Sequence, residues 1–146
     1  MKKLAIAMAL SLLVPSALQA GETKAAAEAK VYFINLKDGD TVSSPFKVQF
    51  GLSNMGVAPA GTEKDNTGHH HLLINRPALG KGEDGADELT SPLPADDNHK
   101  HFGKGQTETV LSLKPGKHTL QLVLADWSHI PHSQPVMSDV ITITVK

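Results

Sequence analysis

The feature that most constrains the fold is an alternation of apolar and polar residues with a period of two, which begins near Lys30 and recurs to the end of the chain. It is found in five segments, residues 31–36, 46–52, 109–113, 118–124 and 141–145. Successive side chains of a strand point to opposite faces, so each segment predicts a strand with one face in a core. Glycine- and proline-containing turns separate the segments, and no sustained helical periodicity accompanies them. The pattern predicts an all-β, immunoglobulin-like two-sheet β-sandwich over residues 30–146.

Composition narrows the class of protein further. The chain has 146 residues, of which 40% are hydrophobic and 20% charged, as in a globular domain. It contains no cysteine, which excludes disulfide bonds, thiolate metal sites and thiol catalysis. The formal net charge is −1, and loss of Lys2 and Lys3 with an N-terminal leader would make the protein more acidic. A mildly acidic chain without a basic stripe argues against nucleic acid or an anionic membrane as partner.

The N-terminus has the pattern of an export signal. Two lysines precede an apolar run, residues 4–14, that is too short to span a bilayer comfortably. Ala20 offers a small residue for cleavage, so we expect a signal peptide over residues 1–20, with an uncleaved N-terminal anchor as the alternative. Residues 21–29 are polar and alanine-rich and are expected to form a flexible, frayed helical lead-in. The expected location is the periplasm, or the outside of the cell.

Two long loops and the histidines between them are the main functional signal. Residues 54–67 and 76–104 are rich in glycine, proline and charge, and loops of this length in a compact domain are often functional. Eight histidines are present, seven of them beside these loops or in the connection before the last strand: His69, His70, His71, His99, His101, His129 and His132. The eighth, His118, stands alone beside a Pro-Gly turn.

Strand direction predicts where these histidines gather. If neighbouring strands are antiparallel, the strand that starts at His69 begins at the end of the sandwich where residues 54–67 cross over. The turn at Pro115-Gly116 then lies at the other end, so the segments before and after this hairpin also meet at the first end. Seven histidines are therefore expected at one end of the sandwich, and His118 at the opposite end.

The spacing of the histidines suggests metal coordination. His69 and His71 are separated by one residue, as are His99 and His101, so each pair projects from one face of an extended chain. Four imidazoles suit Cu(II), Zn(II) or Ni(II). These two pairs are the preferred ligands, with the remaining three of the seven in reserve. The alternative for each histidine is a structural or solvent-exposed role, such as a polar strand edge at residues 69–71.

Other chemistry has weaker support in the sequence. The chain has no nucleophile elbow, no His-Glu-x-x-His motif and no phosphate-binding loop. Four acidic loop residues could approach the histidines and serve as the base of a metal-dependent hydrolase: Glu63, Asp65, Asp96 and Asp97. Asp126 is either a turn residue or a group that orients an imidazole, with the turn favoured. Trp127 is expected to pack over one end of the core.

Several motifs resemble a family of small exported bacterial proteins known chiefly as a domain of unknown function. The matching segments are residues 58–61 (APAG), 68–74 (GHHHLLI), 98–108 (NHKHFGKGQTE), 115–120 (PGKHTL) and 125–132 (ADWSHIPH). The resemblance extends from Val31 to the end of the chain. It implies a secreted β-domain and brings no established activity.

The sequence therefore favours binding over catalysis. The first expectation is a periplasmic metal-binding protein, for copper or zinc, that buffers or delivers the ion. The second is an immunoglobulin-like accessory domain that binds an envelope protein or polysaccharide, and a metal-dependent hydrolase is the third.

Overall fold

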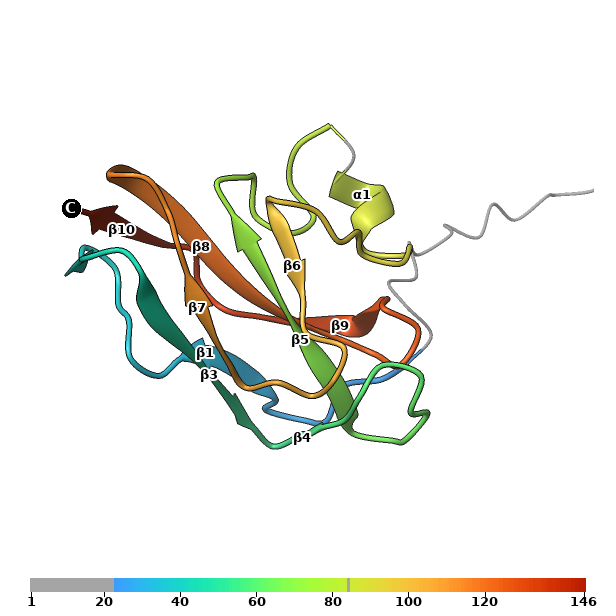
Figure 1. Cartoon of the computed structure of the whole chain (residues 1–146). Helices are drawn as coiled ribbons and strands as arrows, with labels where there is room; N and C mark the ends of the chain where they lie inside the picture. Colours follow the sequence, from blue (N-terminus) through green and yellow to red (C-terminus); the bar gives the residue numbers. More distant parts are fainter. Residues whose placement is uncertain (1–22, 84) are drawn as a thin grey trace, which may run out of the picture.

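Two β-sheets packed face to face form the body of the protein in a computed structural model that describes residues 23–83 and 85–146 (Figure 1). The smaller sheet has the order β1-β3-β7, with β1 at Lys30–Phe33, β3 at Phe46–Ser53 and β7 at Glu108–Leu111. The larger sheet has the order β2-β10-β8-β5-β4. Its strands are β2 at Thr41–Val42, β10 at Ile141–Val145, β8 at Gly116–Ala125, β5 at Thr67–Ile74 and β4 at Gly56–Val57. The all-β, two-sheet sandwich predicted from the alternation is confirmed.

Two further strands extend the larger sheet beside the site described below. β6, at His99–His101, pairs antiparallel with β5, and β9, at Pro131–Met137, pairs antiparallel with the end of β8. Neither strand was predicted from the sequence. β6 has only three residues, and β9 contains two prolines, which cannot donate ladder hydrogen bonds and are confined to strand edges.

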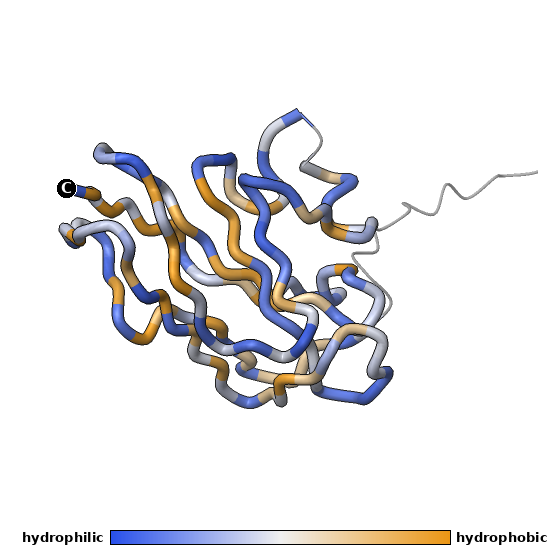
Figure 2. The backbone as a smooth tube through the Cα atoms, in the orientation of Figure 1, coloured by the Kyte–Doolittle hydropathy of each residue, from blue (hydrophilic) through white to orange (hydrophobic). Residues whose placement is uncertain are grey.

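The apolar core lies between the sheets. β3 contributes Val48 and Phe50, both almost fully buried, and they belong to the same cluster as Leu72 of β5 and Leu122 of β8. Figure 2 shows apolar lengths along the central strands and hydrophilic turns at the ends. Alternation along these strands places one set of side chains in this core, as the sequence predicted.

The outer face of the larger sheet is covered as well. Residues 76–98, here called the cover segment, leave β5, include the short helix α1 at Gly85–Glu88, and return to β6 (Figure 1). Leu79 and Leu93 of this segment form a second apolar cluster with Leu73 and Val123 of the sheet. β5 is therefore buried on both faces, since its burial pattern from Gly68 onward is continuous.

The segment before β1 differs from the expected frayed helix. Residues 23–29 contain only a turn, closed by a hydrogen bond from Ala29 N to Ala26 O. Thr23 fastens this segment to the domain, because its hydroxyl donates to Asp126 and its carbonyl accepts from Ser133 N. The predicted signal peptide, residues 1–20, lies outside the described residues. In the part of the chain that the structure describes, no helix is long and apolar enough to cross a bilayer.

Candidate metal centre

β5 sets the direction of the three consecutive histidines. It pairs with β8 so that His69 faces Ala125, His70 faces Leu124 and His71 faces Val123. Because side chains alternate along a strand, His69 and His71 leave the outer face of the larger sheet, whereas His70 enters the core between the sheets. Phe50 of the core lies against the His70 ring, with 5.2 Å between ring centroids.

β6 brings the second histidine pair to the same outer face. Its register places His101 opposite His71 and His99 opposite Leu73. The His101 ring lies 5.0 Å from both the His69 and the His71 ring, measured between centroids. Gly103 leaves room for this ring, since a Cβ atom at that position would collide with His101.

The loop between β8 and β9 supplies the fourth ring. The carboxylate of Asp126 accepts hydrogen bonds from the backbone N–H groups of Ser128 and Ile130, at 2.9 and 3.0 Å, and the Asp126 N–H donates to Ile130 O at 2.9 Å. Within this tight loop His129 has a φ of +69°, a left-handed conformation that costs a non-glycine residue about 1 kcal/mol. The loop thereby holds the His129 ring against His69, with 5.0 Å between centroids.

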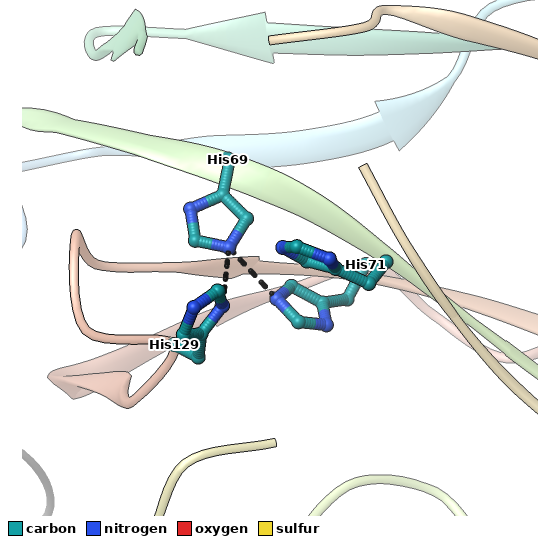
Figure 3. A group of neighbouring side chains, drawn as sticks. His69, His71 and His129 are labelled. Atoms are coloured by element: carbon teal, nitrogen blue, oxygen red, sulfur yellow. Dashed lines mark hydrogen bonds between the residues drawn. The ribbon is translucent and has the colours of Figure 1, made fainter. Parts of the chain in front are cut away.

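Four imidazoles from three separate segments thus form one compact group, called here the histidine group: His69, His71, His101 and His129. One nitrogen from each ring lies within 4.8 Å of the corresponding nitrogen of every other ring. The closest approaches share Nε2 of His69, which lies 3.1 Å from Nε2 of His71 and 3.2 Å from Nδ1 of His129 (Figure 3). Among the residues that the structure describes, imidazoles alone make up this group.

His99 lies just outside the histidine group and contacts it through His71. Its Nε2 is 3.1 Å from Nδ1 of His71, and its Nδ1 is 3.2 Å from Nη1 of Arg76. Arg76 also forms an ion pair with Glu88 of α1, and both side chains are largely buried. A chain of polar contacts therefore runs from the cover segment to the histidine group.

Burial keeps these rings neutral. Desolvation lowers the pKa of His69 and of His99 to about 4, and the pKa of His71 to about 2. Neighbouring imidazoles add to the shift at all three, after the Arg76 charge at His99, and burial also lowers the pKa of His101. The negative charge of Asp126 acts against the shift at His69. Near neutral pH, rings with these pKa values carry a free lone pair and can bind a cation without first losing a proton.

Two of the seven histidines that were expected to share a site lie on the other face of the larger sheet, although at the same end of the sandwich. His70 and His132 lie on the core side of the larger sheet: a Cβ atom added to Gly68, which shares the face of His70, would lie 3.1 Å from Nε2 of His132. The sheet separates both rings from the histidine group, so they are not available as its ligands. His129, held in reserve, takes the place that was expected for His99.

Other sequence expectations have mixed outcomes. His118 lies at the far end of β8, where it contacts Asn75 and Lys114, as expected. Asp126 lies in a turn, and its hydrogen bonds hold the shape of the loop that carries His129. Burial raises its pKa, but hydrogen bonds from Thr23, Ser128 and Ile130 outweigh burial and leave the pKa below its ordinary value. Trp127 does not pack over the core as expected, since the residue is 41% exposed and does not belong to the apolar core cluster.

Two residues of the site are not indicated by the spacing of the histidines. Arg76 follows β5 as an ordinary loop residue, and only the fold brings it to His99. Gly103 is one of twelve glycines, and its role beside the site follows from the His101 ring packed against it. Close approach of this kind depends on strand register, which the sequence does not specify.

A groove of about 610 Å³ borders the loop that carries His129. Trp127 and Ser128 of this loop line it together with Glu63 and Asp65. Trp127 is 41% exposed and is the only aromatic residue among the described residues that form the lining.

Comparison with known proteins identifies the family of the chain. Residues 48–146 match the family described as Domain of unknown function (DUF4399), which is most of the chain. The chain therefore belongs to this family. No match was found among curated proteins or among solved structures.

Proposed function

We propose that this member of the DUF4399 family is an exported metal-binding protein that takes up Cu(II) or Zn(II) at the histidine group and buffers or delivers the ion in the periplasm. One observation carries the proposal: four imidazoles from β5, β6 and the 126–130 loop offer nitrogens that all lie within 4.8 Å of one another. Clustering of this kind has no evident packing purpose on an otherwise apolar outer face.

The spacing of the nitrogens is suitable for a divalent transition metal. Zn–N bonds of about 2.0–2.1 Å place the nitrogens of a tetrahedral site about 3.3 Å apart. The two closest separations in the histidine group, 3.1 and 3.2 Å, are near this value, so small ring rotations would complete a site. All four donors are borderline imidazole nitrogens without a thiolate or thioether among them, which favours Cu(II) and Zn(II) over Cu(I).

Access to the site supports exchange of the ion. His69 and His71 are fully buried, whereas His101 and His129 are partly exposed. An ion can therefore enter from the side of β6 and the 126–130 loop, and two of its four ligands belong to short or loop-borne segments. This arrangement fits buffering or delivery better than a permanent structural ion. Export rests on the predicted signal peptide, and removal of residues 1–20 from secreted protein can be checked by mass spectrometry.

Metal analysis and calorimetry test the proposal directly. Tag-free protein lacking residues 1–20 is purified without a nickel column, analysed for bound metal, stripped with chelator and titrated with Cu(II) and Zn(II). We expect one tight site, and a nanomolar dissociation constant corresponds to about 12 kcal/mol. The His101→Ala/His129→Ala variant removes two ligands from the open side and should lose this site. His118→Ala removes an imidazole at the other end of β8 and should bind normally.

The outcome that contradicts the proposal is equally plain. Binding no tighter than that of an unstructured histidine peptide, or equal binding by the double variant and by His118→Ala, would show that the histidine group does not hold a metal.

The groove supports a second candidate, an accessory domain that binds an envelope polysaccharide. A half-exposed indole beside polar and charged side chains offers a flat apolar face together with hydrogen-bonding groups, which is suitable for a sugar ring. The single tryptophan makes the test simple, because a soluble glycan fragment bound there should change its fluorescence. Binding that survives chelator and is lost in Trp127→Ala would favour this candidate over metal delivery.

A further inference from the structure

The contacts that run from Arg76 to the histidine group determine where the ring protons lie. Arg76 Nη1 is 3.2 Å from His99 Nδ1, His99 Nε2 is 3.1 Å from His71 Nδ1, and His71 Nε2 is 3.1 Å from His69 Nε2. Each contact is short enough for a hydrogen bond, and each neutral imidazole has one N–H and one lone pair. The direction of one bond therefore determines the direction of the next.

Arg76 fixes this direction because a guanidinium group can only donate. His99 Nδ1 must accept from it, so the proton of neutral His99 is on Nε2 and is donated to His71 Nδ1. His71 in turn carries its proton on Nε2, the nitrogen that faces His69 and the rest of the histidine group. Arg76 thus places a proton on the nitrogen of His71 that a metal ion would need.

Coordination of a cation by His71 requires the opposite arrangement. A lone pair on Nε2 of His71 moves the proton to Nδ1, which then donates to His99 Nε2. His99 must carry its own proton on Nδ1, where it points at an N–H of Arg76. Two donors then face each other at a separation of 3.2 Å, and the contact between Arg76 and His99 cannot persist.

Arg76 is also part of the cover segment, so its release has structural consequences. It forms an ion pair with Glu88 of α1, and the Glu88 carboxylate accepts a hydrogen bond from Gly80 N at 3.3 Å. The same segment contacts the histidine group again where Leu93 N donates to His129 O at 2.9 Å. Movement of Arg76 away from His99 therefore disturbs contacts that hold the cover segment against the rest of the domain.

We propose that Arg76 and His99 are positioning residues that oppose a divalent cation at the histidine group, so that metal entry releases Arg76 from His99 and loosens the cover segment. The inference rests on the proposed function and adds regulation of the same site. It involves a change of tautomer in neutral rings, with no proton gained or lost by the protein.

Long-range ¹H–¹⁵N NMR spectra of histidine rings test the proton arrangement without any variant. In the stripped protein, His99 and His71 should both be Nε2–H tautomers, and addition of Zn(II) should convert both to Nδ1–H. Amide exchange at Gly80 should become faster when Zn(II) is added. An Nδ1–H tautomer of His71 in the stripped protein would overturn the inference.

A charge-balanced double variant tests the effect on affinity. Arg76→Met/Glu88→Gln removes the donor to His99 together with its ion-pair partner, so that no buried charge is left unpaired and the net charge is unchanged. Zn(II) should bind at least tenfold more tightly to it than to the wild type. The control, Lys100→Met/Asp97→Asn, removes the exposed ion pair beside β6 without touching a ring nitrogen, and should change the affinity less than about twofold.

Two failures are distinguishable. If all three proteins bind Zn(II) and Arg76→Met/Glu88→Gln binds no more tightly than the wild type, the regulatory inference is wrong and the metal site stands. If none of them binds Zn(II) or Cu(II), the proposed function is wrong and the inference falls with it.

Discussion

Because its buried histidines are neutral, the metal-free protein should lose stability as the pH falls. Burial lowers the pKa of His69, His70 and His99 to about 4 and that of His71 to about 2, against 6.5 for an unperturbed ring. Between about pH 6.5 and 4 the unfolded chain therefore binds more protons than the folded protein at these positions. The resulting stabilisation is fully present above about pH 6.5 and is lost progressively as the pH falls towards 4.

The size of the effect follows from the number of groups. Within this interval each ring contributes up to about 1.36 kcal/mol per pH unit to the free energy of unfolding. Allowing about half of that for solvent penetration and mutual repulsion, four rings give about 2.7 kcal/mol per pH unit. Between about pH 6.5 and 5 this amounts to about 4 kcal/mol, out of about 5–15 kcal/mol for a domain of ordinary stability.

Urea unfolding followed by circular dichroism at about pH 7, 6 and 5, with chelator present and ionic strength fixed, measures this slope. His118→Ala is the matched control, since it removes a partly exposed ring at the far end of β8, outside the histidine group, and should leave the slope unchanged. If the free energy of unfolding does not change over this interval, the buried rings are not neutral in the folded state. The same holds if its slope with pH corresponds to a difference of less than one bound proton between the unfolded and folded states. Saturating Zn(II) should raise the free energy of unfolding at each pH and leave this slope in place, because the bound ion keeps the folded-state rings unprotonated while the unfolded chain still takes up protons.

Three further changes have expected results. Asp126→Asn weakens the hydrogen bonds that shape the His129 loop, so we expect a loss of about 1–3 kcal/mol in urea unfolding and weaker Zn(II) binding by calorimetry. Gly103→Ala places a methyl group against the His101 ring and should weaken Zn(II) binding more than it lowers the melting temperature; equal binding would show that this ring is not a ligand. Leu79→Ala leaves a cavity under the cover segment, where Leu79 is 1% exposed, and should cost about 2–4 kcal/mol of stability, whereas the 61% exposed Val110→Ala should cost little.

The fold could be predicted where one strand face is buried and the other is not. β3 and β10 show this clearly, since their apolar residues alternate and their burial alternates with them. β9 could not be predicted, because it is fixed by pairing with the end of β8 and its prolines argue against a strand. β6 falls within a segment that the sequence predicts to be a loop, because three residues are too few to show a period.

The location of the site could be predicted from the sequence, but which histidines belong to it could be predicted less well. Antiparallel pairing brings His69, His71 and His101 together, and the rule that alternate side chains share a face holds for each pair. The rule does not give the register. His99 lies opposite Leu73, whereas His101 lies opposite His71. His99 therefore contacts Nδ1 of His71, and not the Nε2 atom through which His71 faces the rest of the histidine group.

The membership of His129 depends on backbone geometry that no spacing rule describes. Its left-handed φ results from the hydrogen bonds of one aspartate, and an ordinary loop conformation would point the ring elsewhere.

The hydrogen bonds of the histidine group themselves favour a cation. An imidazole nitrogen has a single position for hydrogen bonding, in the plane of the ring. Nε2 of His69 is nevertheless within 3.2 Å of both His71 and His129, so it cannot form a good hydrogen bond with each. A buried polar group that is poorly paired costs about 1–3 kcal/mol, and a fold selected for stability alone would replace it with an apolar residue. A divalent ion placed between these nitrogens accepts a lone pair from each ring at once and removes the conflict. The crowding of nitrogens that hydrogen bonds cannot satisfy is therefore the physical reason to expect a metal here.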